Sequence, residues 1–350
     1  MPRFVLVVLA VAACHRDDGS PVPAAAAACR GRGTFATLPL GPATGSSLRP
    51  AHTFSIVARD AKTGELGVAV QSHWFSVGAL VAWAEPGVGA VATQSFVEPA
   101  YGPKGLALMG QGVPAPDALA RLVAEDKQAA MRQVAFVDAQ GRAAAHTGDK
   151  CIQVASDHVG SGYTVEANIM ANDKVVPAMA AAFEAARGDL ADRMLAALDA
   201  AQAAGGDLRG CQSAAIVVVS GKRSDAPWNE RELDLRVEDS PAPLDELHRL
   251  VVLARAYDQM NQGDAAVEKS DMAGALAHYG AAARAVPDNI EMKFWQAVAL
   301  AGHGRIDDAL PMFRATFAAD PAWAELTRRL VAPGLLPDAA TAERVLREAR

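Results

Sequence analysis

The 350-residue chain has few aromatic residues and no concentration of positive charge. Aromatic side chains make up 5% of the residues, whereas alanine is abundant. Because aromatic rings supply much of the buried area of large cores, this composition favours close-packed helices and small core side chains over a large β-sandwich core. Lys and Arg number 33 against 40 Asp and Glu, and the formal net charge is −7. Since phosphate binding needs a basic surface, we predict no nucleic-acid partner.

Motifs for metal, nucleotide and serine chemistry are also missing. The eight histidines form no His-x-x-x-His spacing and no Cys-x-x-Cys occurs, so we predict neither a metal nor another cofactor. Gly160-Ser161-Gly162 does not match the Gly-x-Ser-x-Gly pattern of a nucleophile elbow. Gly87-x-Gly89 lacks the third glycine and the following helix of a dinucleotide loop. We interpret these glycines as turn residues.

Residues 1–13 have the pattern of a bacterial lipoprotein signal peptide. Arg3 gives a positive start, residues 4–13 form an unbroken apolar run, and Val11-Ala12-Ala13-Cys14 resembles a lipobox. The run is shorter than the roughly 20 residues that a membrane-spanning helix needs. We therefore predict cleavage before Cys14 and anchoring in the membrane through lipid on this cysteine. The alternative is an ordinary secretory signal in which Cys14 is incidental.

Residues 14–51 have the composition of a flexible tether. They contain Pro21-Val22-Pro23, five consecutive alanines and scattered Gly, Ser and Thr. Such a segment cannot bury enough apolar area to offset the entropy of ordering it. Together with the signal peptide, the tether predicts a lipid-anchored protein on the periplasmic side of the bacterial cell envelope. His15, which follows Cys14 where Asp would favour the inner membrane, indicates the outer membrane.

The four cysteines are Cys14, Cys29, Cys151 and Cys211. With Cys14 acylated, three remain in an oxidising compartment. Cys151 and Cys211 both flank predicted core strands, and we predict a disulfide between them. Two buried free thiols are the alternative, because two cysteines alone define no geometry.

Residues 53–70 are the most informative stretch of the chain. Apolar residues alternate along both halves of it: Phe54, Ile56 and Ala58, then Leu66, Val68 and Val70. Lys62-Thr63-Gly64 supplies a turn between the halves, so the stretch predicts a β-hairpin. Thr53 and Ser55 share one face of its first strand.

Further elements follow as far as residue 220. We predict strands over residues 87–96, 133–138, 141–146 and 212–220, and helices over residues 103–127, 172–186 and 188–204. Strands that bracket two long helices indicate an α+β domain over residues 52–240. Their order fits a four-layer αββα sandwich.

Five segments together resemble the bacterial family called domain of unknown function 1028: residues 53–60, 67–70, 87–94, 145–148 and 212–215. That family is similar in fold to N-terminal-nucleophile (Ntn) hydrolases. Many members start Met-Thr-Phe-Ser, so that removal of the methionine exposes the threonine. The resemblance implies an Ntn-hydrolase-like domain that hydrolyses a small amide or peptide substrate with Thr53 as nucleophile. The substrate of the family is not established.

The nucleophile prediction depends on a free amine at Thr53. A threonine hydroxyl is activated when its own α-amine acts as general base, and such an amine titrates at about 7.7–8.0. A peptide nitrogen is not a base, and 52 residues precede Thr53. Catalysis therefore requires cleavage between His52 and Thr53. Without it, the alternative is a non-catalytic binding or scaffold protein of the envelope.

Four further residues are candidates for the catalytic site. Ser72 has the same parity as the apolar residues of its strand and His73 the opposite parity, so only one of them can meet Thr53. His73 would orient or protonate a leaving group, with a structural histidine as the alternative. Ser95 and Asn168 would donate to an oxyanion, with a strand-end turn or cap as the alternative for each.

Residues 244–350 predict a separate helical repeat domain. Ala275, Tyr279 and Pro287 recur 34 residues later as Ala309, Phe313 and Pro321, a period typical of tetratricopeptide helix pairs. Two units seldom bury enough apolar area alone, so we expect docking on the first domain or homodimerisation.

The partner of this helical domain is open between two classes. A similar tail in the resembling family has been labelled peptidoglycan-binding, which would need exposed aromatics such as Trp295 and Trp323. The alternative is that both tryptophans are packing residues and that a helical groove binds protein or peptide.

Overall fold

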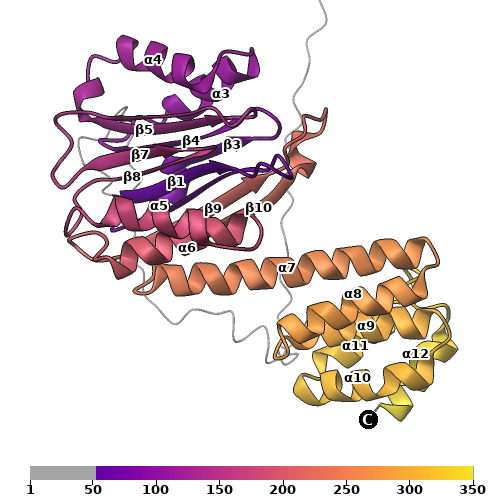
Figure 1. Cartoon of the computed structure of the whole chain (residues 1–350). Coiled ribbons are helices and arrows are strands. Elements are labelled where there is room, and N and C mark those ends of the chain that lie inside the picture. The colour runs from indigo at the N-terminus through magenta and orange to yellow at the C-terminus, as the bar shows by residue number, and fades with distance from the viewer. Residues whose placement is uncertain (1–52, 350) are drawn as a thin grey trace, which may run out of the picture. The chain divides into compact units, whose positions relative to one another are not determined.

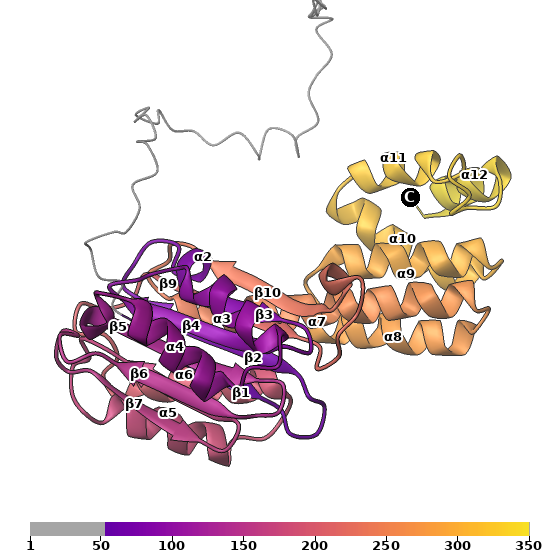
Figure 2. The ribbon, with the colours of Figure 1, turned by 90° about the horizontal axis from the view of Figure 1, so that it is seen from above.

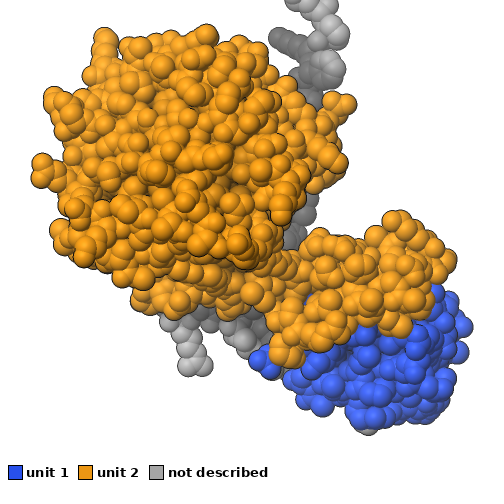
Figure 3. All heavy atoms as spheres, viewed as in Figure 1, with its two compact units in different colours: residues 1–40, 288–350 blue, residues 41–287 orange. Residues whose placement is uncertain are grey.

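The computed structural model describes residues 53–349. The predicted signal peptide, Cys14, Cys29 and the tether lie outside the described residues. The described chain divides after Pro287 into two compact units: the first along the chain is residues 53–287, orange in Figure 3, and the second is residues 288–349, blue in Figure 3. Within the first unit, helix α7 begins at Pro243, next to the predicted end of the α+β domain.

The first unit contains two antiparallel sheets. The six-stranded sheet has the order β10-β9-β2-β1-β8-β7 and consists of β1 (Thr53–Arg59), β2 (Leu66–Ser72), β7 (Ser156–Gly160), β8 (Tyr163–Ala167), β9 (Ser213–Val219) and β10 (Arg231–Val237). The four-stranded sheet has the order β3-β4-β5-β6 and consists of β3 (Ala82–Glu85), β4 (Gly89–Ser95), β5 (Arg132–Asp138) and β6 (Ala143–Thr147).

The predicted hairpin at the start of the domain is confirmed. β1 pairs with β2 from Thr53 opposite Ser72 to Arg59 opposite Leu66. Gly64 takes a left-handed φ of 84° in the connecting turn, a conformation that glycine adopts without a steric penalty. The hairpin therefore places Thr53 and Ser72 side by side at one end of the sheet.

Helices cover the outer face of each sheet (Figure 1). α3 (Tyr101–Gly110) and α4 (Ala115–Glu125) cover the four-stranded sheet, and Figure 2 shows them lying across it. α5 (Val175–Ala185) and α6 (Leu190–Ala203) cover the six-stranded sheet. α6 begins after Asp189, whose carboxylate accepts a hydrogen bond from the backbone N–H of Asp192, as expected of an N-cap. Short elements complete the unit: α2 (Gly78–Val81), η1 (Ala129–Met131) and η2 (Pro227–Asn229).

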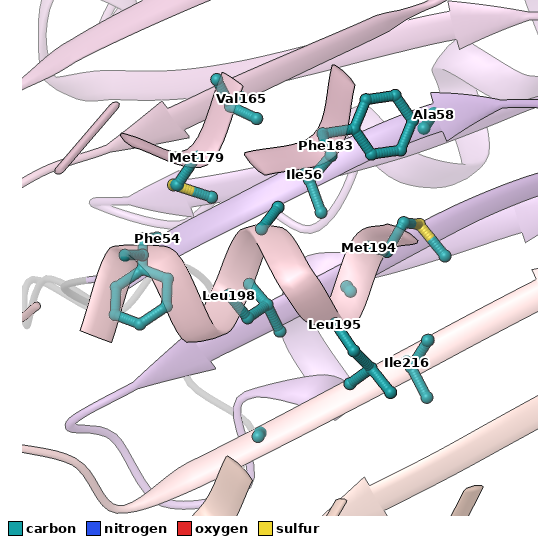
Figure 4. Close-up of a cluster of buried hydrophobic side chains, with 14 of the residues drawn as sticks. Phe54, Ile56, Ala58, Val165, Met179, Phe183, Met194, Leu195, Leu198 and Ile216 are labelled. Carbon is teal, nitrogen blue, oxygen red and sulfur yellow. The ribbon is translucent and has the colours of Figure 1, made fainter. Parts of the chain in front are cut away.

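The alternation along β1 divides its side chains between two cores. Phe54 and Ile56 point toward α5 and α6, where they meet Phe183 and Leu198 (Figure 4). Val57 points to the other face, into a core between the two sheets that consists largely of Val and Ala. The layers are therefore helices, sheet, sheet and helices, in a mixed α+β arrangement with antiparallel sheets.

The C-terminal region is helical, as predicted. The first unit ends with α7 (Pro243–Glu268) and α8 (Met272–Ala285), which pack as a pair. The second unit consists of α9 (Ile290–Gly302), α10 (Ile306–Ala319), α11 (Ala322–Arg329) and α12 (Ala339–Glu348). Within residues 53–349, no helix combines the length and apolar character needed to cross a membrane.

Aromatic rings form the centre of the second unit. The Phe294 ring lies 5.9 Å from that of Phe313, 5.2 Å from Trp295 and 4.7 Å from Trp323, measured between centroids. The indole N–H of Trp295 donates to Glu291. Both tryptophans therefore take part in the packing of this unit.

Candidate functional site

One end of the space between the two sheets is polar. The residues there come from β1, β2, β4, β5, β6, β7 and the end of β8, and we call them the polar cluster: Thr53, Ser55, Ser72, Gln94, Gln133, Thr147, Asp157, Glu166 and Asn168. All except Thr147 and Asp157 are completely buried. Because burying polar groups is costly unless they are hydrogen-bonded, this end of an otherwise apolar core is the candidate site.

Thr53 enters the cluster because it starts β1 with the parity of Val57. Its hydroxyl Oγ1 donates to Ser72 Oγ at 3.3 Å, directly across the β1–β2 ladder. Ser72, not its neighbour His73, meets Thr53. Two hydroxyl groups from adjacent strands thus lie together at the edge of the cluster.

The carbonyl group of Thr53 is held from both sheets. Its oxygen accepts from the backbone N–H of Asn168 at 3.1 Å and from Gln94 Nε2 at 3.3 Å. Asn168 follows β8 in the six-stranded sheet, whereas Gln94 belongs to β4 in the other sheet. The position of Thr53 therefore depends on how the two sheets stack.

Gln133 connects the polar groups in the centre of the cluster. Its Oε1 accepts from Gln94 Nε2 and from Asn168 Nδ2, each at 2.8 Å. Its Nε2 lies within hydrogen-bond distance of Thr147 Oγ1 and of the carbonyl oxygens of Ser156 and Ala167. Since the Asn168 amide donates to Gln133, the structure gives this predicted oxyanion donor a structural partner.

Glu166 is the most unusual residue of the cluster. It is completely buried, and its Oε1 lies 3.3 Å from Ser55 Oγ. Its Oε2 has no hydrogen-bond partner within the described part of the chain. Burial, reinforced by the charge of Asp157 on β7, raises the pKa of Glu166 well above its usual range.

His73 lies outside the polar cluster. Its backbone N–H is 3.4 Å from Asp207 Oδ2, and its imidazole ring lies beside Gly210. The structure therefore does not bring His73 to Thr53.

Ser95 ends β4 with its backbone in the left-handed region, at φ 66°, although it is not glycine. It is completely buried, and its Oγ has no hydrogen-bond partner within the described part of the chain. Non-glycine residues in this region are uncommon and concentrate at functional sites and tight turns. Burial raises the pKa of the Cys151 thiol, which keeps the thiol protonated.

The predicted disulfide is absent from the structure, where Cys151 and Cys211 are both free. Cys151 Sγ donates to the carbonyl oxygen of Arg132, and Cys211 Sγ donates to that of Pro241. Cys151 follows β6, which packs beside β7, whereas Cys211 precedes β9, which packs beside β3. Because these strands lie toward opposite edges of the stacked sheets, flanking a core strand did not bring the two thiols together.

The sequence-based prediction missed Gln94, Gln133 and Glu166. Glu166, on β8, shares its face with Thr164 and Asn168, which are also polar. Gln94 and Gln133 lie on the inner faces of their strands, next to the apolar residues Ala92 and Ala135 of the same parity. For these two glutamines, a break in apolar alternation was the available signal. It marks a buried polar position only if the strand is known to be covered on both faces.

Comparison with known proteins gives the family. The model of a family of unknown function, DUF1028, matches residues 53–247, more than half of the chain. The chain belongs to the DUF1028 family. The crystal structure of a DUF1028 protein from Silicibacter pomeroyi is similar, with 30% sequence identity and a TM-score of 0.52, and the match covers 57% of this chain and 88% of that one. No curated protein matches the chain.

Proposed function

We propose that this DUF1028 domain is an Ntn-hydrolase-like αββα sandwich and that Thr53 is the nucleophile of an amide-bond hydrolase. The observation that carries the proposal is the place of Thr53: the first residue of β1, at the polar end of the space between two stacked sheets, with its hydroxyl on Ser72. An N-terminal nucleophile needs such a strand start among hydrogen-bond donors.

The proposed reaction has two steps. The Thr53 hydroxyl oxygen bonds to the carbonyl carbon of the substrate amide while its proton passes to the α-amine of Thr53. The proton then moves to the leaving nitrogen as the C–N bond breaks, and an ester remains on Thr53. Water, deprotonated by the same amine, breaks the ester and restores the hydroxyl. Ser72 would orient the nucleophile, and cleavage of the His52–Thr53 bond would supply the amine.

A non-catalytic envelope protein is the second candidate. The side chain of Thr53 is completely buried, which favours a structural threonine over an accessible nucleophile. If this second candidate is right, the domain is a scaffold that is held to the outer membrane through lipid on Cys14. The C-terminal helices then bind a protein, peptide or peptidoglycan partner.

We further propose that the C-terminal helices are tetratricopeptide-like repeats. Positions 34 residues apart have the same role: Ala275 and Ala309 are completely buried, as are the rings of Tyr279 and Phe313. The packing of Trp295 and Trp323 on Phe294 supports protein or peptide binding over stacking on peptidoglycan sugars.

The first test is the N-terminus of the protein recovered from both the membrane and the soluble fraction of its native cells, because cleavage before Thr53 separates the domain from the lipid on Cys14. Intact mass and N-terminal sequencing showing a start at Thr53 would support the hydrolase. A start only at acylated Cys14 would support the scaffold.

The second test is covalent labelling with a β-lactone probe, which acylates an N-terminal threonine without knowledge of the substrate. Mass spectrometry should place one probe on Thr53. Thr53→Ala should abolish labelling, whereas Thr63→Ala, in the exposed β1–β2 turn, should not change it. A Thr53→Ala protein that is still labelled would contradict the role of Thr53.

A further inference from the structure

The orientation of the side-chain amides in the polar cluster follows from groups that can only accept hydrogen bonds. The carbonyl oxygens of Ser156 and Ala167 lie 3.2 and 3.0 Å from one terminal atom of Gln133, which must therefore be Nε2. Gln133 Oε1 then faces Gln94. Because it can only accept, the facing atom of Gln94 is also its Nε2, and the carbonyl oxygen of Thr53 requires the same orientation.

The oriented Gln94 determines what Ser55 does. Gln94 Oε1 lies 2.8 Å from Ser55 Oγ and can only accept. The single hydroxyl hydrogen of Ser55 is therefore used on Gln94. Glu166 Oε1 also lies 3.3 Å from Ser55 Oγ. A carboxylate oxygen there would face a hydroxyl oxygen with no hydrogen between them, whereas a protonated carboxyl group would donate to Ser55.

The surroundings of Glu166 also oppose a negative charge. Asp157 on β7 is its direct cross-strand neighbour, and Cys151, in the loop after β6, contributes a thiol that burial keeps protonated. The cluster residues that face Glu166 from β1 and β5, Ser55 and Gln133, are uncharged. Asp157 is half-buried, so protons can reach this end of the cluster from solvent.

We infer that Glu166 is a positioning residue, held as a neutral carboxylic acid whose proton aligns Ser55 and Gln94 and so holds the carbonyl group of Thr53. The hydrogen-bond chain runs in one direction: Glu166 to Ser55, Ser55 to Gln94, and Gln94 to Thr53. If Glu166 loses its proton, the Glu166 carboxylate and Gln94 Oε1 compete for the single hydroxyl hydrogen of Ser55. A second negative charge then also lies beside Asp157. The start of β1 is then held less firmly. That Glu166 acts on a nucleophile rests on the proposed function; its protonation does not.

Infrared spectroscopy tests the protonation directly, because a protonated carboxyl group has a carbonyl stretch separate from that of a carboxylate. We expect this band in the wild-type protein at about pH 8, where an ordinary glutamate is ionised. Glu166→Gln should remove the band, whereas Glu125→Gln, on the exposed face of α4, should keep it. Glu232→Gln is a second control and should also keep the band. The pKa of Glu232 is raised to about 7, so its carboxyl group is mostly ionised at about pH 8. A wild-type spectrum without the band, or a band that survives Glu166→Gln, would overturn the inference.

Labelling of Thr53 by the β-lactone probe tests the positioning role. In the wild type, the labelling rate should rise as the α-amine loses its proton at about pH 8 and fall when Glu166 ionises. Glu166→Gln keeps a donor toward Ser55, so it should keep the rise and lose the fall. Ser55→Ala breaks the chain and should slow labelling on the order of tenfold, with the infrared band retained. An unchanged rate in Ser55→Ala would refute the positioning role. If Thr53 is not labelled in any variant, the proposed hydrolase fails while the infrared result still decides the state of Glu166.

Discussion

Thr53 and Ser72 lie opposite each other at the end of the β1–β2 ladder, with 3.3 Å between their hydroxyl oxygens. The pair is completely buried, and it joins the polar cluster through the carbonyl group of Thr53. Thr53 therefore has two roles: its hydroxyl is the proposed nucleophile, and its backbone carbonyl group holds the start of β1 in place.

Thr53→Ala should lower the free energy of unfolding by about 1–2 kcal/mol, because it removes a buried hydrogen bond and one methyl group. Thr53→Ser keeps the hydroxyl and should retain labelling by the β-lactone probe. Urea unfolding of both variants measures the difference. Equal loss of labelling in the serine and alanine variants would show that the hydroxyl is not the reacting group.

Gln133→Leu should destabilise the protein by about 3 kcal/mol or more, because it removes the acceptor of Gln94 and Asn168 and leaves buried donors unsatisfied. Gln140→Leu, in the exposed turn after β5, should change stability by less than about 0.5 kcal/mol. Urea denaturation at neutral pH checks both values. Similar values for the two variants would mean that the network around Gln133 contributes little.

Glu232 on β10 should make stability depend on pH. Glu232 is exposed at its surface, but partial desolvation together with the charge of Glu65 raises its pKa to about 7 from 4.5. The folded protein then binds a proton more tightly than the unfolded chain, so this contribution is complete below about pH 4.5 and is lost as the pH rises through about 7. Glu232→Gln should remove this part of the pH dependence. The comparison is the urea midpoint of the wild type and the variant at several pH values across that window.

Trp323→Ala should lower the stability of the C-terminal unit by about 2 kcal/mol or more, because its ring packs on Phe294 at 4.7 Å. Trp228→Ala is the matched control: Trp228 is 72% exposed, and its removal should leave unfolding unchanged. Thermal unfolding monitored by circular dichroism compares them. A Trp323→Ala protein of wild-type stability that no longer sediments with peptidoglycan would instead favour a glycan-binding role.

The predictable parts of the fold are those with strong periodicity. The alternation over residues 53–70 predicts the β1–β2 hairpin, and the structure shows that Ser72 rather than His73 faces Thr53. Helices at α3 to α6 and the strands β4, β5, β6 and β9 also lie where the pattern predicts them. In each of these elements burial of one or both faces requires a regular apolar pattern.

The strands that the sequence analysis missed are mostly edge strands. β3, β7 and β10 each stand at an edge of their sheet, and their side chains are mostly half-buried or exposed. An edge strand buries less and carries polar residues, so its pattern is weak. β8, the hairpin partner of β7, was missed although Tyr163, Val165 and Ala167 alternate with the polar Thr164 and Glu166.

The sequence by itself determined that Thr53 starts a strand, that Ser55 shares its face and that helices follow residue 243. Only the tertiary structure decided that this face meets Gln94, Gln133 and Glu166, since Ser55 and Glu166 are 111 positions apart and Gln94 belongs to the opposite sheet. The physical reason is that strand periodicity is a local property of the backbone. The partners of a buried polar group, in contrast, depend on how two sheets stack.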